Sequence, residues 1–354
     1  MYKFFKNIFF LLLILPCNAW ATVNIVVIAP QEGEYAEWGR ELSEGVKIAV
    51  EDINSKGGVL GQQINLIVAD DRCDDVYAVS MAQMLASKKE DKISLVIGPY
   101  CNNKLNEVAE IYAKAKIMQI MPFPVKSDEQ NSNSIAGLKK YQAQAFFEYY
   151  KKNLSGQNVA LAYDPIDKEY TEIATELQMQ FAANHMINRL TVYSLTDFGR
   201  DYKQMAKEML LNNRVIYAVL NNSDVLQLKN AVFDNGANIK LFVNRYMNTG
   251  KNKNGEYYIG LKSFKDSPYF TEILVNLRLQ GKEPIGLGMY GFASLKFWTD
   301  VIAKANSFDY DVLKIVMNNN FFTMPWGEVK GGKSKLPLLY GVFERKGEEY
   351  TQVN

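Results

Sequence analysis

The hydrophobic positions of the chain follow two rhythms that alternate along most of its length. Short runs such as residues 24–29 and 93–97 are apolar almost throughout and have the length and β-branched content of buried strands. Between such runs, apolar residues recur every three to four positions, as at Leu42, Val46 and Ala49, which predicts helices with one buried face. Apolar strands linked by helices indicate parallel sheets that are covered on both faces.

This alternation occurs twice. In the first part it predicts strands at residues 24–29, 64–69, 93–97 and 117–121, and helices at 38–56, 76–87 and 104–115. In the second part it predicts strands at 159–163, 187–194, 215–220 and 240–243, helices at 141–153, 170–184, 202–211 and 225–235, then helices at 269–281, 290–305 and 309–318 and a β-like run at 336–344. We therefore expect an α/β fold of two similar doubly wound lobes, with a ligand cleft at the carboxyl ends of their strands.

The first residues have the pattern of a secretory signal peptide. A short basic start precedes the apolar stretch 8–15, and a small-x-small pattern ends at Ala21. The stretch is much shorter than the roughly 20 apolar residues that span a bilayer, so a cleaved signal over residues 1–21 is preferred to a membrane anchor. Lipidation at Cys17 remains open, although Pro16 occupies a position where a lipoprotein signal has a small residue.

Length and charge narrow the class of protein further. The chain has 354 residues, 48% of them hydrophobic, which is enough for two ordinary domains. Removal of Lys3 and Lys6 with the signal leaves 38 basic against 39 acidic residues. Since no stretch of the remaining chain concentrates basic residues, we expect no nucleic acid partner and no anionic membrane surface as partner.

Two cysteines, Cys73 and Cys101, remain once the signal is removed. A catalytic thiol needs a proton acceptor, and the single histidine, His185, lies in a helical stretch far along the chain. Each cysteine follows a predicted strand, 64–69 or 93–97. If these parallel strands lie side by side, both cysteines emerge at the same edge, so we expect a disulfide between them in an oxidising compartment.

Several short motifs imitate catalytic sites without their context. Residues 327–334 match a phosphate-binding loop pattern, but a Pro-containing β-like run follows where a helix would be needed. The acidic residues around Cys73 lack the spacing of a calcium loop, and Asp197 is expected to cap the following helix. No serine is paired with a histidine in a nucleophile motif. The sequence therefore predicts neither an enzyme, nor a cofactor, nor a metal site.

At this point the chain resembles a known family. The matching stretches are residues 25–29 with Gly33, Trp38 and Gly39, then 49–61, then 70–74 with 97–101, then Asp197-Phe198, and finally 340–343. Together they are similar to periplasmic substrate-binding proteins of the branched-chain amino acid (Leu/Ile/Val-binding) ABC transporter type. In that family the two cysteines are bridged.

The resemblance implies the type I periplasmic binding fold, with two lobes joined by a three-segment hinge. The first lobe would comprise residues 22–136 and 263–327, and the second 137–262 and 328–354. A monomer in the periplasm would close on a small-molecule ligand and pass it to an ABC permease in the inner membrane.

The resemblance also implies ligand-binding positions. By position, Trp38 would lie over the ligand side chain and Tyr170 would close over it from the second lobe. The chain departs from the family elsewhere: Asn102 replaces a serine, Val125 a threonine and Asn221 a tyrosine, and Tyr246 stands near the position of the glutamate that takes the α-ammonium. The full predicted set is Trp38, Tyr100, Asn102, Asn103, Phe123, Val125, Tyr170, Asn221 and Tyr246.

These departures leave alternatives for the function. The ligand is expected to be an amino acid or a similar carboxylate, with an aromatic acid or amide as the alternative, because the predicted pocket is lined by aromatic side chains. Asn102 either contacts the ligand or caps the helix that follows it. A ligand-sensing module for a membrane receptor is a further alternative that the sequence does not separate from a transport protein.

Overall fold

The structure is a computed structural model that describes residues 22–88, 92–101, 104–129, 133–235, 238–246, 254–262, 264, 267, 271, 274–275, 278–279, 281, 286–330, 339–347 and 349–353. The predicted signal peptide and most of the predicted helix 269–281 lie outside these residues. Of the helices that the structure describes, none has the length and hydrophobicity needed to cross a bilayer.

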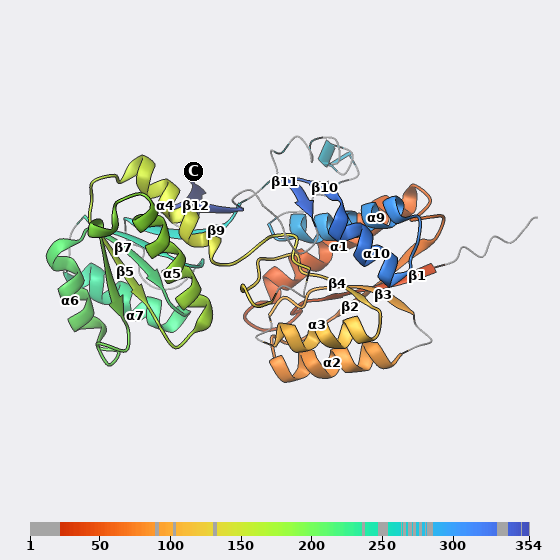
Figure 1. Ribbon diagram of the computed structural model, residues 1–354, viewed down its shortest axis with the longest axis horizontal. Helices are drawn as coiled ribbons and strands as arrows, with labels where there is room; N and C mark the ends of the chain where they lie inside the picture. The colour runs from red at the N-terminus through yellow and green to blue at the C-terminus, as the bar shows by residue number, and fades with distance from the viewer. Residues whose placement is uncertain are drawn as a thin grey trace, which may run out of the picture.

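The described residues form two lobes, each built on its own sheet (Figure 1). The first sheet has the order β2-β1-β3-β4 and consists of β1 (Thr22–Ile28), β2 (Gln63–Ala69), β3 (Ile93–Ile97) and β4 (Met118–Ile120), all parallel. Its helices are α1 (Ala36–Ser55), α2 (Asp75–Ser87), α3 (Leu105–Lys114), α9 (Gly288–Ala305) and α10 (Tyr310–Asn319). The hairpin of β10 (Phe321–Met324) and β11 (Gly327–Lys330) completes this lobe.

Helices cover both faces of the first sheet, as the uniformly apolar strands require. On one face, α1 and α9 bury residues such as Leu42, Val46 and Trp298 against β1 and β3. On the other face, α2 and α3 bury a smaller cluster around Tyr112. The two helices α1 and α9 touch at Gly45 and Gly288, where a Cβ on Gly45 would lie 1.9 Å from the Gly288 carbonyl oxygen. Glycine is therefore required at this crossing.

The second lobe contains a seven-stranded sheet of order β13-β12-β9-β8-β7-β5-β6. Its strands are β5 (Val159–Tyr163), β6 (Leu190–Ser194), β7 (Val215–Val219), β8 (Lys240–Val243), β9 (Glu256–Leu261), β12 (Tyr340–Lys346) and β13 (Glu349–Gln352). Its helices are α4 (Tyr141–Asn153), α5 (Lys168–Ala183), α6 (Tyr202–Asn212) and α7 (Asn222–Asn235). Two buried clusters, one under α4 and α5 and one under α6 and α7, fill the two faces. The predicted α/β class with two similar lobes is confirmed.

Two of the crossings between the lobes run side by side. The Lys262 amide donates a hydrogen bond of 2.8 Å to the Leu339 carbonyl oxygen, and the Tyr290 hydroxyl donates one of 3.0 Å to the Lys262 carbonyl oxygen. Leu339 packs in the core of the first lobe and Tyr340 in that of the second. The last crossing therefore lies at residues 339–340, later than the boundary expected at 327, because β11 pairs with β10 in the first lobe.

The remaining crossing is fastened to the second lobe by charged groups. Lys139 Nζ lies 2.6 Å from Glu169 Oε2, and Lys168 Nζ lies 2.5 Å from Asp128 Oδ2. The Ser127 amide also donates a hydrogen bond of 3.1 Å to a carboxylate oxygen of Glu172 in α5. The segment that leaves β4 is thus held against the first turns of α5.

Three local expectations differ from the structure. Residues 187–189 form a 3₁₀ turn, so that β6 begins at Leu190 rather than at residue 187. The helix after β6 is capped by Asp201, whose carboxylate accepts the Lys203 and Gln204 amides, and not by Asp197. The sequence analysis also did not predict four strands, namely β9, β10, β11 and β13.

Candidate functional site

Aromatic side chains gather at the carboxyl edge of the first sheet. The ring centroids of Trp38 and Tyr100 lie 6.3 Å apart, and those of Tyr100 and Phe123 lie 5.1 Å apart. Tyr35 adds a fourth ring, 5.6 Å from Trp38. All four side chains are partly exposed. The structure thus brings three of the predicted ligand-binding residues, Trp38, Tyr100 and Phe123, into one partly open aromatic surface.

The disulfide stands next to this surface. Cys73 and Cys101 are joined, with 4.8 Å between their Cα atoms, as predicted. The premise of the prediction was wrong, however: β2 and β3 are not neighbours, because β1 lies between them. The bridge therefore spans the end of β1 and ties the loops after β2 and β3 together, which fixes the backbone beside Tyr100.

Beneath the disulfide lies a buried carboxyl group, that of Asp71. Its Oδ1 accepts the Cys73 amide at 3.2 Å, while Oδ2 has no hydrogen-bond partner among the described residues. Burial raises the pKa of Asp71 to about 6, although the amides of Cys73 and Cys101 oppose this shift. The nearby Asp74 has another role, since its side chain caps α2 through the Tyr77 amide. Asp71 and Asp74 thus stabilise the local backbone on either side of Cys73.

In the second lobe, Tyr170 and Arg245 form a pair. Tyr170 stands in the first turn of α5 and is buried, and Arg245 follows β8 at its carboxyl end. The Arg245 guanidinium donates a hydrogen bond of 3.0 Å to the Tyr170 hydroxyl oxygen, and its Cζ atom lies 5.7 Å from the centre of the Tyr170 ring. Burial raises the pKa of Tyr170 to about 12, so its hydroxyl keeps its proton at neutral pH.

The aromatic surface and this pair are within electrostatic reach of each other. Burial raises the pKa of Tyr100 and the neighbouring Tyr35 adds to the shift, while the positive charge of Arg245 opposes it. Arg245 of the second lobe is therefore close enough to Tyr100 of the first lobe for its charge to act on the tyrosine.

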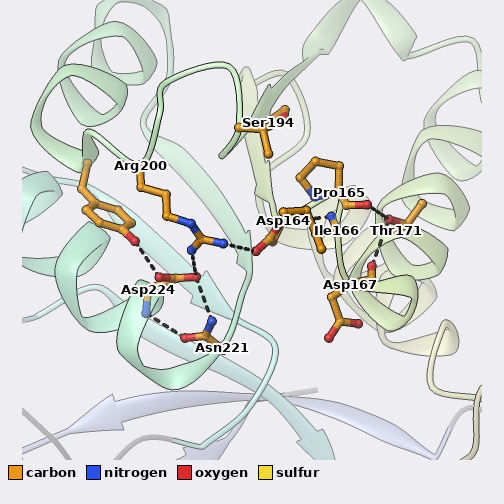
Figure 2. Close-up of polar contacts among 11 residues, drawn as sticks. Asp164, Pro165, Ile166, Asp167, Thr171, Ser194, Arg200, Asn221 and Asp224 are labelled. Carbon is orange, nitrogen blue, oxygen red and sulfur yellow. Dashed lines mark hydrogen bonds and ion pairs between the residues drawn. The ribbon is translucent and has the colours of Figure 1, made fainter. Parts of the chain in front are cut away.

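A second arginine near the carboxyl edge of this lobe is neutralised by its neighbours (Figure 2). Arg200 donates hydrogen bonds of 2.7 Å to both Asp164 and Asp224, and the Tyr202 hydroxyl donates to Asp224 as well. Both aspartates are buried, at 6% and 5% exposure. Arg200 therefore fastens the loop after β6 to the end of β5 and to the first turn of α7, and two carboxylates balance its charge.

Asn221 belongs to this same network. Its Oδ1 accepts the Asp224 amide at 3.0 Å, and its Nδ2 donates to an Asp224 carboxylate oxygen at 2.8 Å. This is the geometry of a residue that caps α7. The predicted role of Asn221 in ligand binding therefore stays a prediction, whereas its contacts with Asp224 stabilise the start of α7.

The other predicted site residues are placed as follows. Tyr246 packs against Tyr258 and Tyr350, with centroids 5.7 and 5.5 Å away, so its ring belongs to a cluster of the second lobe. Val125 is 3% exposed and lies in a small apolar cluster with Leu105 and Met121. Asn102 and Asn103 lie outside the described residues.

The residue that sequence reasoning missed is Arg245. Its neighbour Tyr246 belongs to the predicted set, yet it is Arg245 that contacts Tyr170. Its place directly after a strand of the second lobe was the available signal, because ligands of parallel sheets bind at that edge.

A carboxyl group on the first lobe adds to the electrostatics. Glu41 in α1 accepts a hydrogen bond of 3.1 Å from the Leu287 amide, and burial raises its pKa.

A cavity of about 280 Å³ also exists in this lobe, but it lies between the ends of α2 and α3 and the start of α10, at the amino ends of β3 and β4. It is thus remote from the aromatic surface.

Comparison with known proteins agrees with this arrangement. Residues 22–332 match the sequence profile of a family described as periplasmic binding proteins. The chain belongs to this family. Among characterised relatives, a Leu/Ile/Val-binding protein from Rhizobium johnstonii is 30% identical over 151 residues, which cover 41% of this chain and 40% of the relative. The match thus spans less than half the length of that periplasmic binding protein.

Solved structures of periplasmic binding proteins share the fold over nearly the whole chain. The leucine-binding protein LivK from Thermotoga maritima has a TM-score of 0.71 at 18% identity and covers 94% of this chain and 98% of its own. A solute-binding protein of an ABC transporter from Rhodopseudomonas palustris, solved in complex with 4-hydroxybenzoate, has a TM-score of 0.69 at 16% identity and covers 94% and 96%. The predicted relationship to Leu/Ile/Val-binding proteins is confirmed, and so is the fold.

Proposed function

We propose that this periplasmic binding protein captures a small organic solute with a carboxylate group between its lobes and delivers it to an ABC importer. The observation that carries the proposal is the opposition of two unlike surfaces at the carboxyl edges. The first lobe presents Trp38, Tyr100 and Phe123, and the second presents Arg245 with the Tyr170 hydroxyl. Rings bury the apolar part of a solute, and the cation and hydroxyl fix a polar end.

The relatives support this class of solute. One relative is named for leucine, isoleucine and valine, and one structural neighbour was solved with 4-hydroxybenzoate; both solute types carry a carboxylate. An amino acid is the first candidate for the solute. An aromatic acid is the second candidate, and the aromatic surface of the first lobe favours it. Turnover of the solute is not part of the proposal, because the family consists of binding proteins.

The remaining parts of the proposal follow from the family and the sequence. The protein would act in the periplasm as a monomer after removal of residues 1–21, with an ABC permease in the inner membrane as its partner. The site would comprise the nine predicted residues together with Arg245.

Mass spectrometry of small molecules released by denaturing protein purified without added ligand tests the capture step. Small-angle scattering then tests closure, since a captured solute should lower the radius of gyration. A released carboxylate that also compacts the re-supplied protein is the expected result. If no solute that binds the protein changes its radius of gyration, capture between closing lobes is refuted.

A further inference from the structure

Among the described residues, the charges of the segment that follows β4 are paired more closely than the charge of Arg245. Lys139 lies 2.6 Å from Glu169, and Lys126 lies 3.1 Å from Glu129. Arg245 reaches Glu169 only at 3.9 Å, on a carboxylate that Lys139 already holds. Burial works to raise the pKa of Glu169, but Lys139 and then Arg245 outweigh it and lower the pKa, so this carboxylate is ionised and shared.

The hydrogen bonding of Arg245 is likewise incomplete. Its Nε is buried and has no hydrogen-bond partner among the described residues, and its side chain is 38% exposed. An arginine offers five N–H donors in a planar fork, and burying them without partners is costly. Arg200 shows the satisfied alternative in the same lobe, with two carboxylates at 2.7 Å.

The Tyr170 hydroxyl completes a site for an anion. It accepts the hydrogen bond from Arg245, and its own proton remains to be donated. A carboxylate placed beside both groups would receive a charge-assisted hydrogen bond from the guanidinium and a second from the hydroxyl. Its charge would balance that of Arg245, whose carboxylate contact, Glu169, is 3.9 Å away and is shared with Lys139.

The described carboxylates of the same region offer little to an ammonium group. Glu169 is held by Lys139, and Asp164 and Asp224 are held by Arg200. Glu41 is bound by the Leu287 amide and its pKa is raised by burial. An α-ammonium close to Arg245 would also face a like charge.

We propose that Arg245, with the Tyr170 hydroxyl, binds the carboxylate of the ligand from the second lobe, and that the ligand is an aromatic monocarboxylate without an α-ammonium group. This inference rests on the proposed function and narrows its solute class. The aromatic ring would lie against Trp38 and Tyr100, where stacking and burial of apolar area stabilise it.

Matched probes test the inference by isothermal titration. 3-Phenylpropanoate differs from L-phenylalanine by the α-ammonium and from 3-phenylpropanamide by the carboxylate charge; benzoate and benzamide form a shorter pair. We expect each carboxylate to bind about tenfold to a hundredfold more tightly than its amide, the range for a hydrogen bond to a charged group. L-phenylalanine should bind more weakly than 3-phenylpropanoate.

Variants connect this preference to the named residues. Arg245→Gln should remove the difference between carboxylate and amide, while Arg214→Gln, which replaces an exposed arginine at the other end of the second sheet, should retain it. Tyr170→Phe should weaken carboxylate binding about threefold to tenfold, as expected for one neutral donor. Thermal unfolding of each variant verifies that it is folded.

The outcomes separate the inference from the proposed function. Tight binding of L-leucine or L-phenylalanine, or carboxylate binding that Arg245→Gln leaves unchanged, would overturn the inference and leave solute capture intact. Failure of every probe, together with release of a solute that has no carboxylate, would overturn it as well. If no solute binds or compacts the protein, the proposed function itself falls, and the inference falls with it.

Discussion

The buried carboxyl group of Asp71 makes the stability of the first lobe depend on pH. Its side chain is 0% exposed, and its pKa is raised from 3.8 to about 6, mainly by burial. Since the folded protein holds this proton more tightly than the unfolded chain, stability from this group is present below pH 3.8 and is lost as pH rises to about 6. Above that pH, the folded protein carries a buried charge.

The magnitude follows from the shift. A difference of 2.2 pKa units, at about 1.36 kcal/mol for each unit, corresponds to about 3 kcal/mol. Asp71→Asn removes the ionisation and keeps an oxygen that can accept the Cys73 amide. We therefore expect the variant to be more stable than the natural protein at pH 7 to 8 by up to about 3 kcal/mol, and the difference to shrink as pH falls to about 4.

Urea unfolding followed by tryptophan fluorescence measures this effect in the relevant lobe. Within the described residues the tryptophans, Trp38, Trp298 and Trp326, all lie in the first lobe, so their emission reports its unfolding. Glu44→Gln is the control, because this carboxylate lies on the exposed side of α1 in the same lobe and its loss should change stability by no more than about 0.5 kcal/mol. A variant with the same pH profile as the natural protein between pH 4 and 7 would refute the reasoning.

Two further predictions concern the bridge and the aromatic surface. Protein denatured without reductant should show no titratable thiol from Cys73 and Cys101, and two free thiols in freshly prepared protein would contradict the bridge. Replacement of both cysteines by serine should lower the free energy of unfolding by about 3–4 kcal/mol, the value for closing a loop with 28 residues of separation. Trp38→Ala should weaken solute binding by about 1–3 kcal/mol. Trp298→Phe, in the core, should alter stability and leave affinity unchanged. Equal losses of affinity in both variants would show that Trp38 acts through folding.

The elements that the sequence predicts well are those whose apolar positions coincide with their buried positions. The limits of α4, β5 and β8 agree with the predicted ranges because their apolar patterns match burial directly. β9 was not predicted because it begins with Glu256, and a charged residue at this position is more typical of an exposed loop than of a buried strand. In the folded protein Glu256 is buried between Lys229 at 2.9 Å and Arg345 at 3.1 Å, partners that only the tertiary structure supplies.

The candidate site shows the same division. Trp38 was predicted from the resemblance to the family, and Tyr100 and Phe123 as aromatic residues of the same expected pocket. Arg245 also stands directly after a strand, but its importance depends in addition on Tyr170, which is 75 positions away, and on the pairing of Lys139 with Glu169, which the sequence does not show. Tyr246, next to it, turns to Tyr258 instead, and neighbours along a chain at a strand end cannot be separated by pattern alone.

The paired crossings at Lys262 and Leu339 also govern when the protein can become folded during its synthesis. The first lobe packs α1 against α9, which begins only at Gly288, and the second lobe places β12, which begins at Tyr340, beside β9 in the middle of its sheet. A chain that is made from its N-terminus therefore exposes the apolar stripe of α1 until α9 has been made, and an open edge on β9 until β12 has been made. Neither lobe can therefore reach its final packing before the segments that begin at Gly288 and Tyr340 are present, so neither is completed as an early, independent half.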